Sequence, residues 1–381
     1  MNSHTIVRLQ GPDRVRKRPA VIFGSDGADG VRQMIELLLH IFLTEAALGH
    51  NHDIRVTLGA DGGVTIASRD RGLILDETLQ DGTPIWQQVF CELFSAPAQP
   101  DEEYYFSLGT QHHHLFAGDE APALRLDHDP AFDLCCVQYA SRSMRVEAVR
   151  DGVRKIAAFA QGYSVAPLSK EPTDAPHGTV ISFLPDEQVF TDVTISAAAV
   201  GAALQDAAIA IPGLCCTLTD ERDGTEVTYH YPNGAIDYVA AVASPVAVFS
   251  HTLSANGRDR YNRPPYQATV KVTVAFVPAG GTTLCLHNHR RMVSGGTHRD
   301  AAMAQIAKRV EWECGATDVA SRLILVLEST CDAGATRYAT GARSAITNPM
   351  MADMAADLMG EEFSHFLQQH AAAIAAVFPR D

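Results

Sequence analysis

One segment, from Arg32 to His50, most constrains how this chain can fold. Its sequence, RQMIELLLHIFLTEAALGH, has the length of a helix, yet its polar residues do not gather on one face. Such an all-round apolar helix is typical of a buried core or of a membrane. Glu36, His40 and Glu45 interrupt the apolar run, and a membrane-spanning helix would bury them at high cost. We therefore expect this helix inside a globular domain.

The composition predicts two globular domains with little affinity for DNA. The chain has 381 residues, 46% of them hydrophobic, which suffices for two separate cores. Lys plus Arg is 30 and Asp plus Glu is 45, so the net charge is −15, and no basic run offers a DNA-binding footprint. The eight cysteines include no CxxC spacing, which argues against a zinc knuckle. Without a signal peptide at the start, we expect a cytoplasmic protein.

Turn residues and alternating apolar positions predict an α+β fold. Two strands flank the Asp-Gly-Gly turn within residues 53–70, and further hairpins turn at the Asp-Gly pairs 151–152 and 223–224. A helix is expected at 192–211. A second unit from residue 233 would add long strands, a helix and a long terminal helix from about Asn348. Helices covering one face of a largely antiparallel sheet would bury this pattern.

The order of several motifs resembles the amino-terminal half of the bacterial gyrase B and topoisomerase IV B subunits. VRKRPAVIFG resembles the family's VRKRPGMYIG, and EAALGH resembles EALAGH. HGTVISFLPDEQVFTDVT, SGGTHRDAAMAQIAKRV and ATRYATG follow where the family has GTMVRFWPSLETFTNVT, its GGTH helix and QTKDKL. The resemblance implies a GHKL-type α/β sandwich, the Bergerat fold, at residues 1–232. A transducer domain like ribosomal S5 domain 2 would follow at 233–381.

The same resemblance implies that parts of a full subunit are missing. Nothing resembles the acidic EGDSA motif, so we expect the TOPRIM and later gyrase B domains to be absent. Few residues precede the VRKRP motif, where the family has an arm that swaps between subunits. A homodimer and pairing with a gyrase B subunit both remain open as assemblies.

Two positions of the first family helix have lost the residue types that ATP hydrolysis requires. The family's general base, a glutamate, corresponds to Leu37, and its magnesium-binding asparagine corresponds to Ile41. An aliphatic side chain can neither accept a proton nor supply the oxygen ligands of a hard cation. Glu36 lies beside the lost base but is turned by about 100° around the helix. We therefore expect neither ATP nor magnesium as a cofactor.

The adenine-binding DxGxG motif is also altered. Its aspartate corresponds to Ser68 and its first glycine to Asp70, whereas Arg71 and Gly72 match the family. Serine can form one hydrogen bond but not the charge-assisted contact of a carboxylate. We expect Asp70 to crowd a backbone path that suits glycine.

The glycine-rich lid of the family is altered as well, while three pocket positions are kept. Ala131 and Asp133 stand at glycine positions, so a phosphate cradle is not expected. Thr179 matches the threonine of the adenine water network, and Arg150 an arginine at the pocket mouth. Arg337 replaces the transducer lysine, and its guanidinium could still dock an anion.

Histidines raise the alternative of a metal site. Residues 112–114 are all histidine, His128 follows in the same segment, and His287, His289 and His298 form a second group. His287 and His289 would share one face of a strand, an arrangement that suits a divalent ion. No carboxylate or cysteine spacing supports either group, so we predict no metal site and interpret the histidines as solvated or pocket-lining.

The adjacent Cys135 and Cys136 allow two interpretations. Either thiol could be a nucleophile with a lid histidine as its base. Adjacent cysteines on a packed element are more often small core residues, and we favour that interpretation.

The sequence thus predicts a gyrase-B-like protein that has lost ATP-driven topoisomerase function. Its altered pocket would bind a small anionic molecule of accessory or specialised metabolism. If it also transforms this molecule, His40, Asp70 or a lid histidine would supply acid–base function, and Arg71 with Arg337 would hold the anion. A salt bridge that closes a collapsed pocket is the other interpretation of His40, Asp70 and Arg71. The alternatives are a non-catalytic decoy or regulator of DNA gyrase and a residual ATPase fragment.

Overall fold

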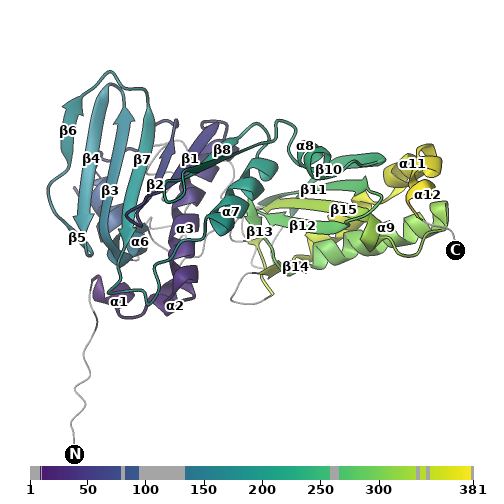
Figure 1. Ribbon diagram of the computed structural model, residues 1–381, viewed down its shortest axis with the longest axis horizontal. Coiled ribbons are helices and arrows are strands. Elements are labelled where there is room, and N and C mark those ends of the chain that lie inside the picture. The colour runs from purple at the N-terminus through teal and green to yellow at the C-terminus, as the bar shows by residue number, and fades with distance from the viewer. Residues whose placement is uncertain are drawn as a thin grey trace, which may run out of the picture. The chain divides into compact units, whose positions relative to one another are not determined.

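The computed structural model divides into two compact units, each described here by itself (Figure 1). It describes residues 9, 11–78, 82–93, 134–257, 266–331, 335–339 and 344–378. The first unit contains the described residues up to 204 and residues 215–228, and the second contains residues 205–214 and those from 229 onwards.

A nine-stranded sheet forms the first unit, with the order β5-β4-β3-β7-β2-β1-β8-β9 and β6 paired to β4. The strands are β1 Asp53–Leu58, β2 Val64–Ser68, β3 Ser141–Arg150, β4 Val153–Ala160, β5 Tyr163–Ser164, β6 Ser169–Pro172, β7 Gly178–Pro185, β8 Cys215–Asp220 and β9 Thr225–His230. The ladders from β4 to β1 are antiparallel, and β1 runs parallel to β8. Burial alternates along β2 and β7, because successive side chains point to opposite faces of the sheet.

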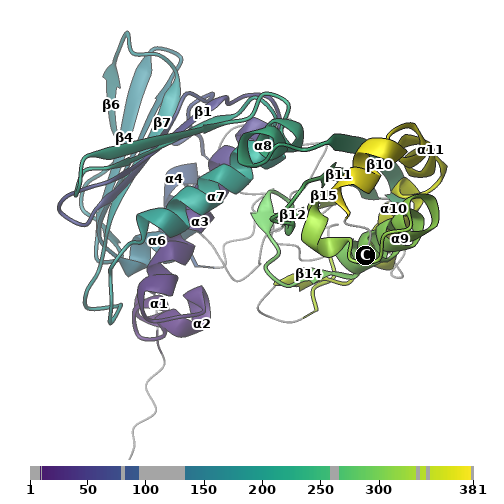
Figure 2. The same cartoon turned by 45° about the vertical axis from the view of Figure 1, so that its right-hand side comes forward.

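Helices cover one face of this sheet, as Figure 2 shows for α3 and α6. The helices of this part of the chain are α1 Asp13–Arg16, α2 Pro19–Phe23, α3 Ala28–Ala47, α4 Ile85–Cys91, α6 Leu134–Ala140 and α7 Ala197–Ala210. α3 is the apolar helix of the sequence, and it contacts both β2 and α6. Its apolar residues are buried all round because the sheet and neighbouring helices enclose it. The predicted α+β sandwich is therefore confirmed.

The second unit is built on a five-stranded sheet with the order β10-β11-β15-β12-β13. Its strands are β10 Ala247–Gly257, β11 Tyr266–Phe276, β12 Thr282–His287, β13 Arg290–Arg291 and β15 Leu323–Cys331, and a small pair joins β14 Gly295–Gly296 to β16 Ala345–Ile346. Its helices are α8 Ala235–Val242, α9 Thr297–Cys314, the 3-10 turn η2 Ala320–Arg322, α10 Pro349–Leu358, α11 Glu361–Gln369 and α12 Ala371–Val377. Residues of α9 and α10 share a core with one sheet face, and residues of α8 share a core with the other.

Two helix predictions need correction. The single terminal helix expected from Asn348 is three helices, because the chain turns at Gly360 and again at His370. A Cβ at Gly360 would lie 2.8 Å from the Asp357 carbonyl oxygen, so this turn suits glycine. The helix expected at 192–211 begins at Ala197, where the Ser196 hydroxyl accepts a hydrogen bond from a first-turn amide at 3.2 Å.

Candidate functional site

The face of α3 that carries Leu37 and Ile41 is apolar and closed to solvent. Leu37 and Ile41 lie one helical turn apart, with side chains 6% and 1% exposed. His40 is also buried, and its carbonyl accepts a hydrogen bond from the Thr44 hydroxyl at 3.0 Å. Neither Leu37 nor Ile41 carries an oxygen atom in its side chain, so this face does not fit magnesium.

An ion pair one turn further along α3 joins the helix to the loop after β2. The Arg71 guanidinium donates through Nη2 to Glu45 Oε1 at 2.7 Å and through Nε to Oε2 at 3.0 Å. The Glu45 side chain is fully buried, whereas that of Arg71 is 24% exposed. Arg71 was expected to hold an anion or to close the pocket with Asp70 or His40. Its charge is compensated by Glu45, which begins the EAALGH motif but was not expected to take part in the site.

Asp70 is the centre of a buried hydrogen-bond network. Its Oδ2 accepts from the Ser68 hydroxyl at 2.5 Å, and its Oδ1 accepts from the Gly72 amide at 2.7 Å and the Thr179 hydroxyl at 2.9 Å. Ser68 and Thr179 face each other because β2 and β7 pair at these two residues. Burial raises the pKa of Asp70 above its usual range, although these three hydrogen bonds act in the opposite direction.

Gly72 occupies a position where a larger residue would clash. Gly72 has a φ of +75°, and a Cβ on it would collide with the Val149 carbonyl oxygen. The Arg150 guanidinium donates to the Gly72 carbonyl at 3.2 Å, so the end of β3 holds this loop. Asp70 does not take the left-handed conformation. The expected crowding at Asp70 is therefore wrong, because the tight turn lies at Gly72.

Arg337 belongs to the second unit, in an anchored segment. The Asn348 side chain accepts from the Arg337 amide at 2.7 Å and donates to the Ala335 carbonyl at 2.7 Å. The Thr347 amide donates to the Arg337 carbonyl at 2.7 Å. The guanidinium itself is exposed and has no hydrogen-bond or ion-pair partner among the described residues. This segment therefore presents a cation on a fixed backbone.

The histidine predictions have different outcomes. Residues 112–114 and His128 lie outside the described residues, as do Ala131 and Asp133 of the lid. His287 ends β12, and His289 follows in a turn with a φ of +66°. The expectation that the two share one face of a strand is therefore wrong. Within the described ranges, no group of three or more His, Cys, Asp or Glu side chains is arranged to hold a metal ion.

His287 and His298 of the second unit are buried, and these two and His289 have lowered pKa values. His287 shares hydrogen bonds with the Ser329 hydroxyl at 2.9 Å and the Thr336 hydroxyl at 3.1 Å. His298, fully buried, has no partner at either ring nitrogen among the described residues. Burial lowers the pKa of His287 to about 3 and those of His289 and His298 to about 4. These histidines are structural groups of the core rather than solvated ones.

Cys135 and Cys136 lie in α6, and both are fully buried. This placement agrees with their interpretation as small core residues. Across the described part of the chain, no helix is long and apolar enough to cross a membrane.

Comparison with curated proteins finds gyrase-type relatives. No protein-family model matches the chain. The DNA gyrase B subunit of Streptomyces coelicolor is 24% identical over 334 residues, covering 81% of this chain and 45% of the relative. The DNA topoisomerase 4 B subunit of Enterococcus faecalis is 23% identical over 395 aligned residues, covering 97% of this chain and 53% of the relative. The chain thus spans about half the length of the curated relatives it matches.

Comparison with solved structures finds the same kind of protein. The 43K ATPase domain of Thermus thermophilus gyrase B, crystallised with an aminocoumarin, matches with a TM-score of 0.70 at 20% identity, covering 97% of this chain and 93% of that one. The gyrase B subunit of Myxococcus xanthus matches with a TM-score of 0.69 at 17% identity. The chain therefore has the GHKL fold of the gyrase B and topoisomerase IV B ATPase region, and it resembles these subunits in sequence over most of its length.

Proposed function

We propose that this chain is a gyrase-B-like protein that does not hydrolyse ATP and whose altered pocket binds a small anionic molecule. The observation that carries the proposal is the pair Leu37 and Ile41, both buried and apolar at the positions of the family's base and magnesium ligand. Attack of water on a phosphate needs a group that accepts its proton and a cation that neutralises the developing charge. Neither requirement is met by these two side chains.

The polar floor of the pocket supports binding without hydrolysis. Ser68, Asp70 and Thr179 form a connected network, and buried networks of this kind hold their members in defined positions. A ligand's anionic group would be repelled by an ionised Asp70, so its uncharged end would face this floor. The anionic group would lie towards the arginines at Gly72.

The arginine side chains near Gly72 support an anionic ligand. Arg71 and Arg150 both approach the Gly72 turn, and their side chains are 24% and 25% exposed. Guanidinium groups bind carboxylate and phosphate through two parallel hydrogen bonds. Glu45 pairs with Arg71 through two hydrogen bonds of 2.7 and 3.0 Å, whereas Arg150 meets the exposed Asp151 carboxylate only at 3.6 Å, so Arg150 is the stronger candidate for the anion-binding group.

The proposal is tested by calorimetry and a turnover assay on the full chain. The probes are ATP with magnesium, ATP with a chelator, inorganic phosphate and a set of small carboxylates and phosphate esters. We expect no magnesium-dependent ATP turnover and saturable binding of at least one non-nucleotide anion. Arg150→Gln should weaken that binding about tenfold or more. Its matched control is Arg145→Gln, which changes an arginine of the same strand that pairs with Glu147.

Two results would overturn the proposal. One is micromolar binding of ATP with magnesium accompanied by hydrolysis, which would identify a working ATPase. The other is an equal effect of Arg150→Gln and Arg145→Gln on anion binding, with circular dichroism showing both variants folded. The second result would show that the anion binds elsewhere than at Arg150.

A second candidate function is a non-catalytic decoy or regulator of DNA gyrase. It is favoured by retention of the fold across 97% of the chain, although the base and the magnesium ligand are replaced. Such a chain could pair with a gyrase B subunit or sequester an inhibitor of the aminocoumarin type. Light scattering after mixing with a gyrase B subunit tests the first role, and titration with an aminocoumarin tests the second. A lack of both mixed species and aminocoumarin binding would exclude this candidate.

A further inference from the structure

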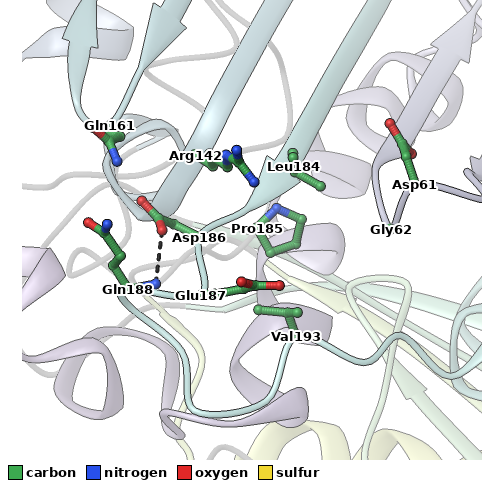
Figure 3. Close-up of a pocket in the computed structure, with 10 residues that line it drawn as sticks. All are labelled: Asp61, Gly62, Arg142, Gln161, Leu184, Pro185, Asp186, Glu187, Gln188 and Val193. Carbon is green, nitrogen blue, oxygen red and sulfur yellow. Dashed lines mark hydrogen bonds between the residues drawn. The ribbon is translucent and has the colours of Figure 1, made fainter.

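A pocket lies in the first unit, at the end of the sheet where β7 finishes (Figure 3). Its volume is about 280 Å³, and its lining includes the cation of Arg142, the carboxylates of Asp61, Asp186 and Glu187, and the neutral side chains of Gln161, Leu184, Gln188 and Val193. Thr179, beside Asp70, is at the opposite end of β7, and six residues of strand span about 20 Å. This pocket is therefore separate from the one in the proposed function.

A distortion of β3 determines the direction of the Arg142 side chain. The register between β3 and β7 shifts between Ser141 and Ser143, so Arg142 is the extra residue of a β-bulge. Bulges redirect side chains and recur beside binding sites. The Arg142 guanidinium is exposed and has no hydrogen-bond or ion-pair partner among the described residues. The bulge thus presents a cation to the pocket.

Glu187 is held on the other side of the pocket by its neighbour. Asp186 is buried, pairs with Arg16 at 2.6 Å and accepts from the Gln188 amide at 2.9 Å. These contacts fix the backbone on both sides of Glu187. The Glu187 carboxylate is exposed and, in the described part of the chain, has no hydrogen-bond or ion-pair partner. In the view of Figure 3, Glu187 and Arg142 lie on opposite sides of Pro185.

The remaining walls supply the Asp61 carboxylate, which accepts from the Gly63 amide at 2.9 Å, together with neutral polar groups and an apolar surface. Gln161 holds a left-handed conformation with a φ of +49° in the turn before Gly162, and such conformations are often kept at functional sites. Gln161 and Gln188 each carry a carboxamide that can donate and accept. Leu184, Pro185 and Val193 provide the apolar part. The volume is near the lower end of the range of about 300–1,000 Å³ for ligand pockets, which suits a ligand smaller than a nucleotide.

We propose that this pocket binds a small zwitterion, a free amino acid with an apolar side chain. Opposite charges that line one pocket without pairing can both be satisfied by a ligand that carries a carboxylate and an ammonium group. The carboxylate would dock on Arg142 and the ammonium on Glu187. The side chain would cover Leu184 and Val193.

The test is calorimetric titration of the full chain with three isosteric probes. L-Leucine carries both charges, L-leucinamide lacks the carboxylate, and 4-methylpentanoate lacks the ammonium group. We expect leucine to bind at least tenfold more tightly than either single-charge probe. Arg142→Gln should abolish this preference over leucinamide, and Glu187→Gln should abolish the preference over 4-methylpentanoate. Arg145→Gln, on the same strand outside the pocket, should leave all three affinities unchanged.

Several outcomes would overturn the zwitterion site. No leucine binding at millimolar concentration, or leucinamide binding as tightly as leucine, would each exclude it. Unchanged leucine affinity in both pocket variants would show that any binding occurs elsewhere. Both variants alter exposed side chains, so we expect them to fold, and circular dichroism is the check. Anion binding by Arg150 is unaffected by any of these outcomes, so the two proposals fail independently.

Discussion

The Glu45 carboxylate and the Arg71 guanidinium form a two-point ion pair in which the carboxylate is fully buried and the guanidinium remains partly exposed. Removing one member of a buried pair leaves the other charge uncompensated, which costs about 3–5 kcal/mol. Arg71→Met would leave the buried carboxylate, so we expect a loss of this size in the free energy of unfolding. Glu45→Gln would leave an arginine that water can reach, so its loss should be smaller.

Urea unfolding of both single variants and of the double variant measures this asymmetry. The double variant should lose less stability than the sum of the two single losses, because neither charge is left unpaired. Equal losses in the two single variants would contradict the burial difference. Additive losses in the double variant would show that the two side chains are not coupled.

Asp70 should make the first unit more stable as the pH falls towards 4. Burial raises the folded-state pKa of Asp70 above the ordinary value of 3.8, so the folded protein binds its proton more readily than the unfolded chain. The stabilisation by this proton is complete below pH 3.8 and is lost as the pH rises through the folded-state pKa. Its slope is at most about 1.4 kcal/mol per pH unit.

Asp70→Asn tests this linkage while keeping a side chain of the same shape. The amide oxygen can still accept from the Gly72 amide and the Thr179 hydroxyl, and the Ser68 hydroxyl can rotate to accept from the amide nitrogen. The stability difference between wild type and variant should shift in favour of the wild type as the pH is lowered from neutral towards the ordinary aspartate range. A difference that is independent of pH would mean that Asp70 titrates alike in both states.

Much of the fold could be predicted because its markers are local. The Asp151-Gly152 turn has positive φ at both residues, the conformation that this dipeptide favours in hairpins. The prediction of one terminal helix is wrong because apolar spacing continues through Gly360 and His370, and the turns there depend on tertiary contacts. Strand β10 was not identified either, since only its pairing along β11 distinguishes it.

The site was harder to predict because its contacts join residues far apart in the chain. Glu45 and Arg71 are both visible in the sequence, yet their pairing depends on how α3 packs against β2. Glu45 could have been selected as an acidic residue near the end of an apolar helix. Crowding at Asp70 was a wrong expectation, because sequence alone did not show which residue of Asp70-Arg71-Gly72 takes the left-handed turn.

Acid should weaken the second unit through its buried histidines. Burial lowers the folded-state pKa of His298 from 6.5 to about 4, so the unfolded chain binds the proton more readily. Stability therefore falls as the pH drops from about 6.5 towards 4. His298→Leu removes this proton linkage and leaves no hydrogen bond broken among the described residues. Relative to wild type, the free energy of unfolding of the variant should rise by about 2 kcal/mol on going from about pH 8 to about pH 5.

His287→Leu and His50→Leu are the comparisons for this prediction. His287→Leu would remove the ring partner of Ser329 and Thr336, so we expect a loss of about 1–3 kcal/mol at about pH 8. His50 is exposed, and its replacement should change stability little at either pH. Thermal and urea unfolding at both pH values measure these differences. An identical pH response of His298→Leu and wild type would contradict the proposed linkage.

Gly72 and Gly224 offer a matched test of how tightly the candidate site is built. Their φ values are +75° and +74°, so alanine meets the same backbone penalty of about 1–2 kcal/mol at both. At Gly224 an added Cβ meets nothing within 4 Å, whereas at Gly72 it collides with the Val149 carbonyl oxygen. Gly72→Ala should therefore lose clearly more stability than Gly224→Ala in urea unfolding. It should also weaken anion binding, because Arg150 follows Val149 and holds the Gly72 carbonyl. Equal losses in the two variants would mean that the loop moves away from β3 without cost.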